Sequence, residues 1–203
     1  MSQNTLPVND TGRVPPKSIR GLLLQKFERL PENDKRSFAN GPLFLGVSGA
    51  CVGLFANTLY RQVLNVTQGL ITSSLPMTVL PFLTTVALYN AAVSQPLLAG
   101  ELNCPTCALI RGGLVSALAG GFYPVLLALP VSAGLATRYN TAPMPERGNV
   151  LRFWINITQP ILNRMGIVFL MQAIFGLYMG SKHYGIYIKM LELPTSNSEE
   201  LND

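Results

Sequence analysis

The 203-residue sequence predicts an all-α polytopic membrane protein, a small bundle of about four transmembrane helices preceded by an amphipathic helix. Only 12% of its residues are charged, whereas soluble proteins carry charges at about a quarter of their positions. Uncharged stretches of 24, 39, 26 and 17 residues begin after Arg36, Arg61, Arg111 and Arg164. About 20 apolar residues suffice for a helix to cross the hydrocarbon core of a bilayer. Because lipid offers no partners to backbone amides, these stretches must be helical.

The N-terminal region divides into two parts. Residues 1–16 are polar and are predicted to be a disordered tail. Residues 17–36 form a basic amphipathic segment whose apolar side chains recur at helical spacing. Such a segment is typical of a matrix-targeting sequence or of a helix on an anionic membrane surface, and a solvated helix before the first span is the alternative. No secretory signal peptide is present, because many charges precede the first apolar run near Pro42.

The predicted membrane domain covers residues 37–193. Its first span is expected at residues 42–60, where Gly49 and Gly53 form a flat stripe that suits helix packing in lipid. The second span, residues 70–89, contains Pro76 and Pro81, each of which removes a backbone donor and disfavours a straight helix. A packing kink is the favoured interpretation of these prolines, since no charged residue accompanies them as in many transport sites.

The second half of the domain is expected to hold two further spans. Residues 112–131 form the third and carry a second packing stripe of Gly113, Ala117 and Gly121. Residues 161–180 form the fourth. Between the spans, residues 95–111 are expected to be a loop and residues 135–159 a long hydrophilic connection, which includes Glu146 and Arg147. Residues 194–203 are predicted to be a disordered acidic tail.

The distribution of basic residues predicts the orientation. With four spans both termini lie on one side, and that side carries ten of the fifteen basic residues. The positive-inside rule then places both termini in the cytosol or the mitochondrial matrix. Three or five spans remain alternatives, because the prolines weaken the second span.

Reactive side chains are sparse. Cys104 and Cys107 form the one reactive-looking cluster, a possible redox pair in the loop after the second span. A zinc site would need four ligands, and the single His183 lies far along the chain and is interpreted as an interfacial anchor. No phosphate-binding loop or hydrolase motif occurs. The sequence therefore predicts no enzyme, no cofactor and no small-molecule substrate, and the net charge of +5 is attributed to topology rather than nucleic-acid binding.

Several strings, in their order along the chain, resemble the transmembrane protein 126 family. The resemblance covers about residues 30–193 and rests on Asn57-x-Leu59-Tyr60-Arg61, Leu64-Asn65-Val66-Thr67, Leu75-Pro76-x-x-x-Leu80-Pro81-Phe82-Leu83-Thr84-Thr85, Cys104-x-x-Cys107, Tyr123-Pro124-Val125-x-Leu127-Ala128 and Gly134-Leu135-Ala136-x-Arg138-Tyr139. The cysteine pair and the Leu-Asn-Val-Thr string fit the A paralogue better than the B paralogue. Gln62 departs from the pattern, which has a second arginine there, and the N-terminal tail has no clear match.

The resemblance implies a mitochondrial inner-membrane protein with both termini in the matrix. It further implies a non-catalytic scaffold that helps to assemble respiratory complex I, with membrane-arm subunits and other assembly factors as partners. Two functions of other classes compete with this expectation. One is a small carrier or channel built around the second span, and the other is a thiol redox protein that uses Cys104 and Cys107.

Overall fold

The computed structural model describes residues 16–139 and 150–193, and this part of the chain is helical throughout apart from short turns. The predicted tails before residue 16 and after residue 193, together with Glu146 and Arg147, lie outside the described residues. Four continuous helical segments are long and apolar enough to cross a bilayer, namely Glu32–Val63, Leu70–Leu98, Pro105–Tyr139 and Arg152–Glu192. The prediction of an all-α polytopic membrane protein is confirmed.

The elements follow one another as nearly uninterrupted helix. In chain order they are α1 (Pro16–Glu28), α2 (Glu32–Val63), α3 (Leu70–Tyr89), η1 (Asn90–Ser94), α4 (Gln95–Leu98), α5 (Pro105–Val115), η2 (Ser116–Phe122), α6 (Tyr123–Tyr139) and α7 (Val150–Glu192). The two η elements are π-helical turns inside longer helices, where one extra residue per turn re-aims the side chains that follow.

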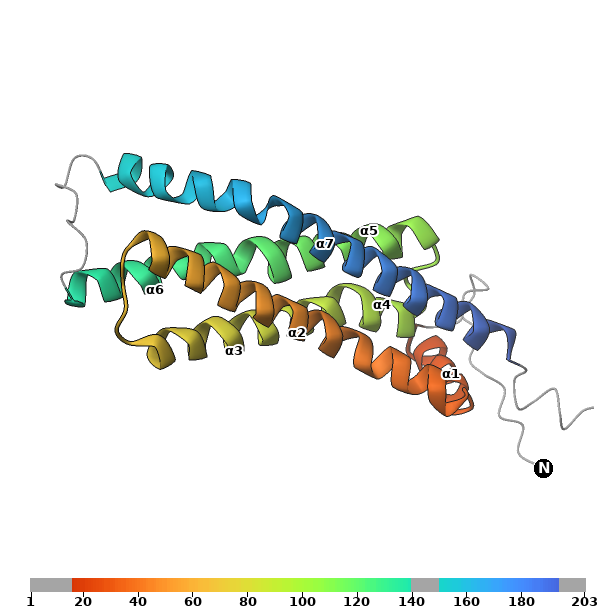
Figure 1. Ribbon diagram of the computed structural model, residues 1–203. Coiled ribbons are helices and arrows are strands. Elements are labelled where there is room, and N and C mark those ends of the chain that lie inside the picture. Colours follow the sequence, from red (N-terminus) through yellow and green to blue (C-terminus); the bar gives the residue numbers. More distant parts are fainter. Residues whose placement is uncertain (1–15, 140–149, 194–203) are drawn as a thin grey trace, which may run out of the picture.

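The long helices lie side by side in an antiparallel bundle (Figure 1). We call the end that holds α1, residues 99–104 and the last turns of α7 the terminal end, and the opposite end, with the turn of residues 64–69, the far end. Both described ends of the chain meet at the terminal end, where Lys26 Nζ donates to the carbonyl of Leu191 at 3.1 Å. The far turn needs Gly69, whose φ of 68° favours glycine, and a side chain there would face Leu135 and Tyr139 of α6.

The third helix begins earlier than its sequence suggests. Residues 95–111 were expected to be a loop, but α4 occupies the start of this range and α5 begins at Pro105. Cys104 caps the new helix and Pro105 takes its first position, where a missing N–H costs nothing. The expected connection of residues 135–159 is also shorter, because α6 runs to Tyr139 and α7 starts at Val150.

The fourth helix is much longer than a single membrane crossing requires. With 43 residues, α7 is about 65 Å long at 1.5 Å per residue, roughly twice the hydrocarbon thickness. Its last turns pack with α1 and the start of α2 around the buried side chains of Leu23, Phe38 and Met190. An ion pair between Lys189 and Asp34 at 3.0 Å joins α7 to α2 there. The bundle itself therefore buries Leu23 of α1, whereas Leu22 and Leu24 remain exposed.

Pro76 and Pro81 lie within an unbroken helix, because α3 continues from Leu70 to Tyr89. Each proline deprives the carbonyl four residues earlier of its helical donor. For Pro81 that carbonyl belongs to Met77, and it faces Gly53 of α2. The broken helix that would suit a carrier is not formed at either proline.

Candidate functional site

The small-residue stripe predicted on the first span faces the inside of the bundle. A methyl group added to Gly53 would collide with the carbonyl oxygen of Met77, and one on Gly49 would lie 3.0 Å from Thr85 Oγ1. The methyl group at Gly49 would also lie 3.2 Å from the Cα of Gly120. The stripe thus packs α2 against α3 and η2 of the same chain, so a partner helix must use another surface.

The second predicted stripe packs against α7. A methyl group on Gly113 would lie 3.0 Å from Leu177, and one on Gly121 would lie 3.1 Å from Phe169. Ala117 is half-buried between them along the chain. This stripe, too, is used for contacts within the chain.

A further close approach of two helices was missed in the sequence. On α7, Gly176 and Gly180 meet the backbone of α5 at Gly112 and Ala108, so that any added side chain would strike a carbonyl. The signal was present, because Gly176-x-x-x-Gly180 has the spacing that permits close backbone contact in lipid.

Polar side chains also connect helices inside the bundle. Ser116 Oγ donates to the carbonyl of Gln172 at 2.7 Å, and Gln172 Nε2 donates to Ser48 Oγ at 3.0 Å. Gln172 is 2% exposed, so these bonds lie where no water competes for them. They fix η2, α7 and α2 relative to one another and add no reactive group.

Large apolar side chains instead cover the outside of the bundle. The outer face of α3 presents Leu70, Ile71 and Leu75, and that of α7 presents Ile167 and Leu170. In α3 and α7 only 22% of the membrane-spanning window is buried within the protein. These faces contact lipid or the helices of other proteins, since a water-exposed patch of this extent would be unfavourable.

The predicted redox pair lies at the start of a helix rather than in a loop. Cys104 is the N-cap of α5, and its sulfur accepts a hydrogen bond from the backbone N–H of Cys107 at 3.3 Å. Hydrogen bonds from the Cys107 thiol and from the Cys107 backbone lower the pKa of the Cys104 thiol. Both cysteines are free thiols at the terminal end. Within residues 16–139 and 150–193, no cluster of side chains could complete a metal site.

His183 is not the interfacial anchor that its position predicted. The imidazole is fully buried, stacks on Phe38 with ring centroids 4.5 Å apart, and lies 3.3 Å from Tyr89 Oη. A side chain at Gly41 would collide with it. This histidine is enclosed by α2 and α3 and holds the terminal end together.

A polar cluster at the far end was also missed. Arg61 was counted only as a topological charge, but it is 6% exposed and donates to Ser73 Oγ at 3.1 Å and to the carbonyl of Gln68 at 3.0 Å. Asn57 Nδ2 donates to the same Ser73 oxygen at 3.1 Å. The sequence shows these polar residues one turn apart near the end of the first span, but not that they converge on the second helix.

Comparison with known proteins identifies relatives that match most of the chain. The family described as Transmembrane protein 126 matches residues 17–197. Transmembrane protein 126A of Mus musculus is 45% identical over 181 residues, which are 89% of this chain and 92% of that protein. The human protein of that name is 43% identical over 86% of this chain and 90% of its own length. "Complex I assembly factor TMEM126B, mitochondrial" of Rattus norvegicus is 33% identical over 83% of this chain and 72% of its own. No solved structure matches the chain significantly.

Proposed function

This chain belongs to the transmembrane protein 126 family, and on that premise we propose that it is a non-catalytic assembly factor for respiratory complex I. The observation that carries the proposal is its relation, over 83% of its length, to proteins named as mitochondrial complex I assembly factors. The proposed partners are membrane-arm subunits of complex I and other assembly factors. The proposed location is the mitochondrial inner membrane, with both termini in the matrix.

The packing of the bundle supports a scaffold that acts through its outer faces. The small-residue stripes are filled by the chain's own helices, whereas α3 and α7 present long rows of apolar side chains outward. A partner helix that replaces lipid on such a face gains close packing without displacing any interior contact. The grouping of Lys26, Lys35, Arg36, Lys182 and Lys189 on the elements of the terminal end supports the matrix orientation.

Loss of the protein tests this function directly. Mitochondria without it are expected to accumulate incomplete membrane-arm intermediates of complex I, which native electrophoresis resolves. Re-expression of the wild-type chain is expected to restore the mature complex. Full levels of complex I with no stalled intermediates would contradict the proposal.

Site-specific photo-cross-linking tests the proposed surface. A photoreactive residue at Ile167, which is 75% exposed, is expected to capture membrane-arm subunits in intact mitochondria. The same residue at Met165, which is fully buried on the same helix, serves as the matched control. Equal capture of subunits from both positions would show that the outer face of α7 is not the contact.

A second function, thiol redox chemistry, is favoured by the surroundings of Cys104. Cys104 caps a helix, and its thiol pKa is lowered, which are two properties of reactive cysteines. Replacing Cys104 and Cys107 by serine distinguishes the functions. The scaffold retains complex I assembly in this variant, whereas a redox protein loses it.

A further inference from the structure

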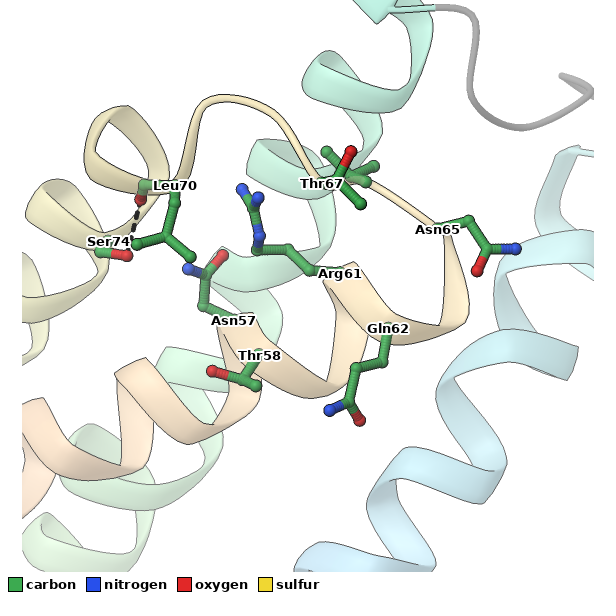
Figure 2. Close-up of a pocket in the computed structure, with 9 residues that line it drawn as sticks. Asn57, Thr58, Arg61, Gln62, Asn65, Thr67, Leu70 and Ser74 are labelled. Carbon is green, nitrogen blue, oxygen red and sulfur yellow. Dashed lines mark hydrogen bonds between the residues drawn. The ribbon is translucent and has the colours of Figure 1, made fainter.

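A polar pocket opens at the far end of the bundle, between the last turn of α2 and the first turns of α3. Its volume is about 420 Å³. Figure 2 shows the side chains around it, with Thr58 and Gln62 contributed by α2, Thr67 by the turn and Ser74 by α3. Arg61 lies among them and extends from α2 toward the turn. The pocket is thus built from residues of a tight hairpin at the level where two spanning helices leave the membrane.

The charge in this pocket has only neutral partners in the described parts of the chain. Arg61 is 6% exposed and bonds to the hydroxyl of Ser73 and the carbonyl of Gln68. The ion pairs found within residues 16–139 and 150–193 all lie at the terminal end. A guanidinium carries five N–H donors, so these two bonds leave donors for an anion. A buried charge without a counterion is strongly unfavourable, which makes a bound anion the natural complement.

A polar atom beside Arg61, Asn57 Oδ1, has no hydrogen-bond partner in the described structure. The Ser73 hydroxyl donates to the carbonyl of Leu70 at 3.2 Å, so it can only accept from its other neighbours. Asn57 must therefore present its amide nitrogen to Ser73, which leaves Asn57 Oδ1 buried without a hydrogen bond in the described structure. The wall of the pocket thus offers the remaining N–H donors of Arg61 and one acceptor without a hydrogen bond, Asn57 Oδ1.

A shallow apolar groove continues the pocket along the outer surface of α3. It is lined by residues of this one helix, namely Leu70, Ile71, Ser74, Leu75, Thr78 and Val79. Leu70 and Ser74 line both the pocket and the groove. Since α3 crosses the membrane, the groove leads from the interface toward the hydrocarbon core. A free phosphate would contact only the pocket, whereas a molecule with an anionic head and an apolar chain would fill both the pocket and the groove.

We propose that the pocket and groove together bind one anionic phospholipid of the leaflet at the far end. Its phosphate contacts Arg61, and one acyl chain lies along α3 between Ile71 and Val79. Arginine suits this role because its planar donors match phosphate oxygens. The inference goes beyond complex I assembly and does not depend on it.

The test uses the full chain in detergent, with lipid binding measured by native mass spectrometry. The probes are phosphatidylglycerol and phosphatidylcholine with identical acyl chains, and inorganic phosphate as competitor. Ser74→Asp places a carboxylate in the pocket, where it neutralises Arg61 and repels phosphate. Ser74 is only partly buried, so a carboxylate at this position keeps access to solvent. Thr137→Asp is the matched control, because this exposed residue lies in the last turn of α6 at the same end but outside the pocket.

The expected results separate a lipid site from its alternatives. Phosphatidylglycerol is expected to bind about tenfold more tightly than phosphatidylcholine to the wild type and to Thr137→Asp, and Ser74→Asp is expected to abolish this preference. Arg61→Gln is expected to do the same, and Ser74→Asp decides the outcome if loss of the Arg61 bonds unfolds the hairpin. Equal binding of the two lipids to the wild type, or an unchanged preference in Ser74→Asp, would overturn the proposal. Displacement of phosphatidylglycerol by equimolar inorganic phosphate would overturn it as well, since the site would then bind a free anion.

Discussion

Gly53 offers the sharpest test of how α2 and α3 are held together. Pro81 leaves the carbonyl of Met77 without its helical donor, and this oxygen occupies the space in which a side chain at position 53 would begin. In Gly53→Ala the new methyl group meets that backbone oxygen and also approaches Pro81 Cγ at 3.2 Å. Neither neighbour is the end of a flexible side chain, so the two helices must separate or tilt.

The size of the effect follows from a comparison with Gly166→Ala on α7. An added methyl group there has nothing within 4 Å, so this variant reports only the gain in helix propensity, at most about 1 kcal/mol. Overpacking a well-packed interface costs about 1–3 kcal/mol. At a cost of 2 kcal/mol the midpoint of thermal unfolding falls by about 4–8 °C for a chain of this length. Gly49→Ala is expected to lie between the two, because its nearest neighbour is a hydroxyl 3.0 Å away.

The assay is thermal unfolding in one detergent, with the three variants measured beside the wild type and the free energy of unfolding compared at the wild-type midpoint. The difference between Gly53→Ala and Gly166→Ala removes the propensity contribution and isolates the contact with α3. If these two variants melted within 1 °C of each other, the close approach of α2 to α3 would be refuted.

Three further predictions concern the terminal end. His183→Ala is expected to lower the free energy of unfolding by about 2–4 kcal/mol, since it empties a fully buried site, whereas Lys182→Ala on the exposed side of the same turn changes it by less than about 0.5 kcal/mol in chemical denaturation. Lys189→Ala breaks an ion pair whose lysine is 60% exposed, so the same measurement is expected to show a loss of no more than about 1 kcal/mol. Cys107→Ala removes the thiol hydrogen bond, the largest of the causes that lower the pKa of Cys104, while the backbone N–H of residue 107 stays in place. The pKa of Cys104 therefore rises, its thiolate fraction at neutral pH falls, and the pH profile of Cys104 alkylation moves to higher pH. An unchanged profile would show that Cys107 does not tune Cys104.

The number of spanning helices could be predicted because it depends on composition. Long stretches without charge must be helical in lipid, whatever they contact. The ends of the helices were harder to predict. A helix can continue beyond the length that a membrane requires when it finds protein to pack against, as α7 does beside α1 and α2. Cys104 and Pro105 form a start signal for α5, but the charged residues around them concealed it.

The role of each small residue required the tertiary structure. Gly49 and Gly53 were predicted to suit close packing, but their spacing is the same whether the neighbour is a helix of this chain or of a partner. In the same way, His183 and Arg61 have side chains that suit a membrane interface, and only the packing around them shows that both are buried. Sequence thus determined which segments enter the membrane, because the free energy of transfer into lipid depends on each segment alone. The tertiary structure decided what each segment contacts, because packing energy depends on side chains that lie far apart along the chain.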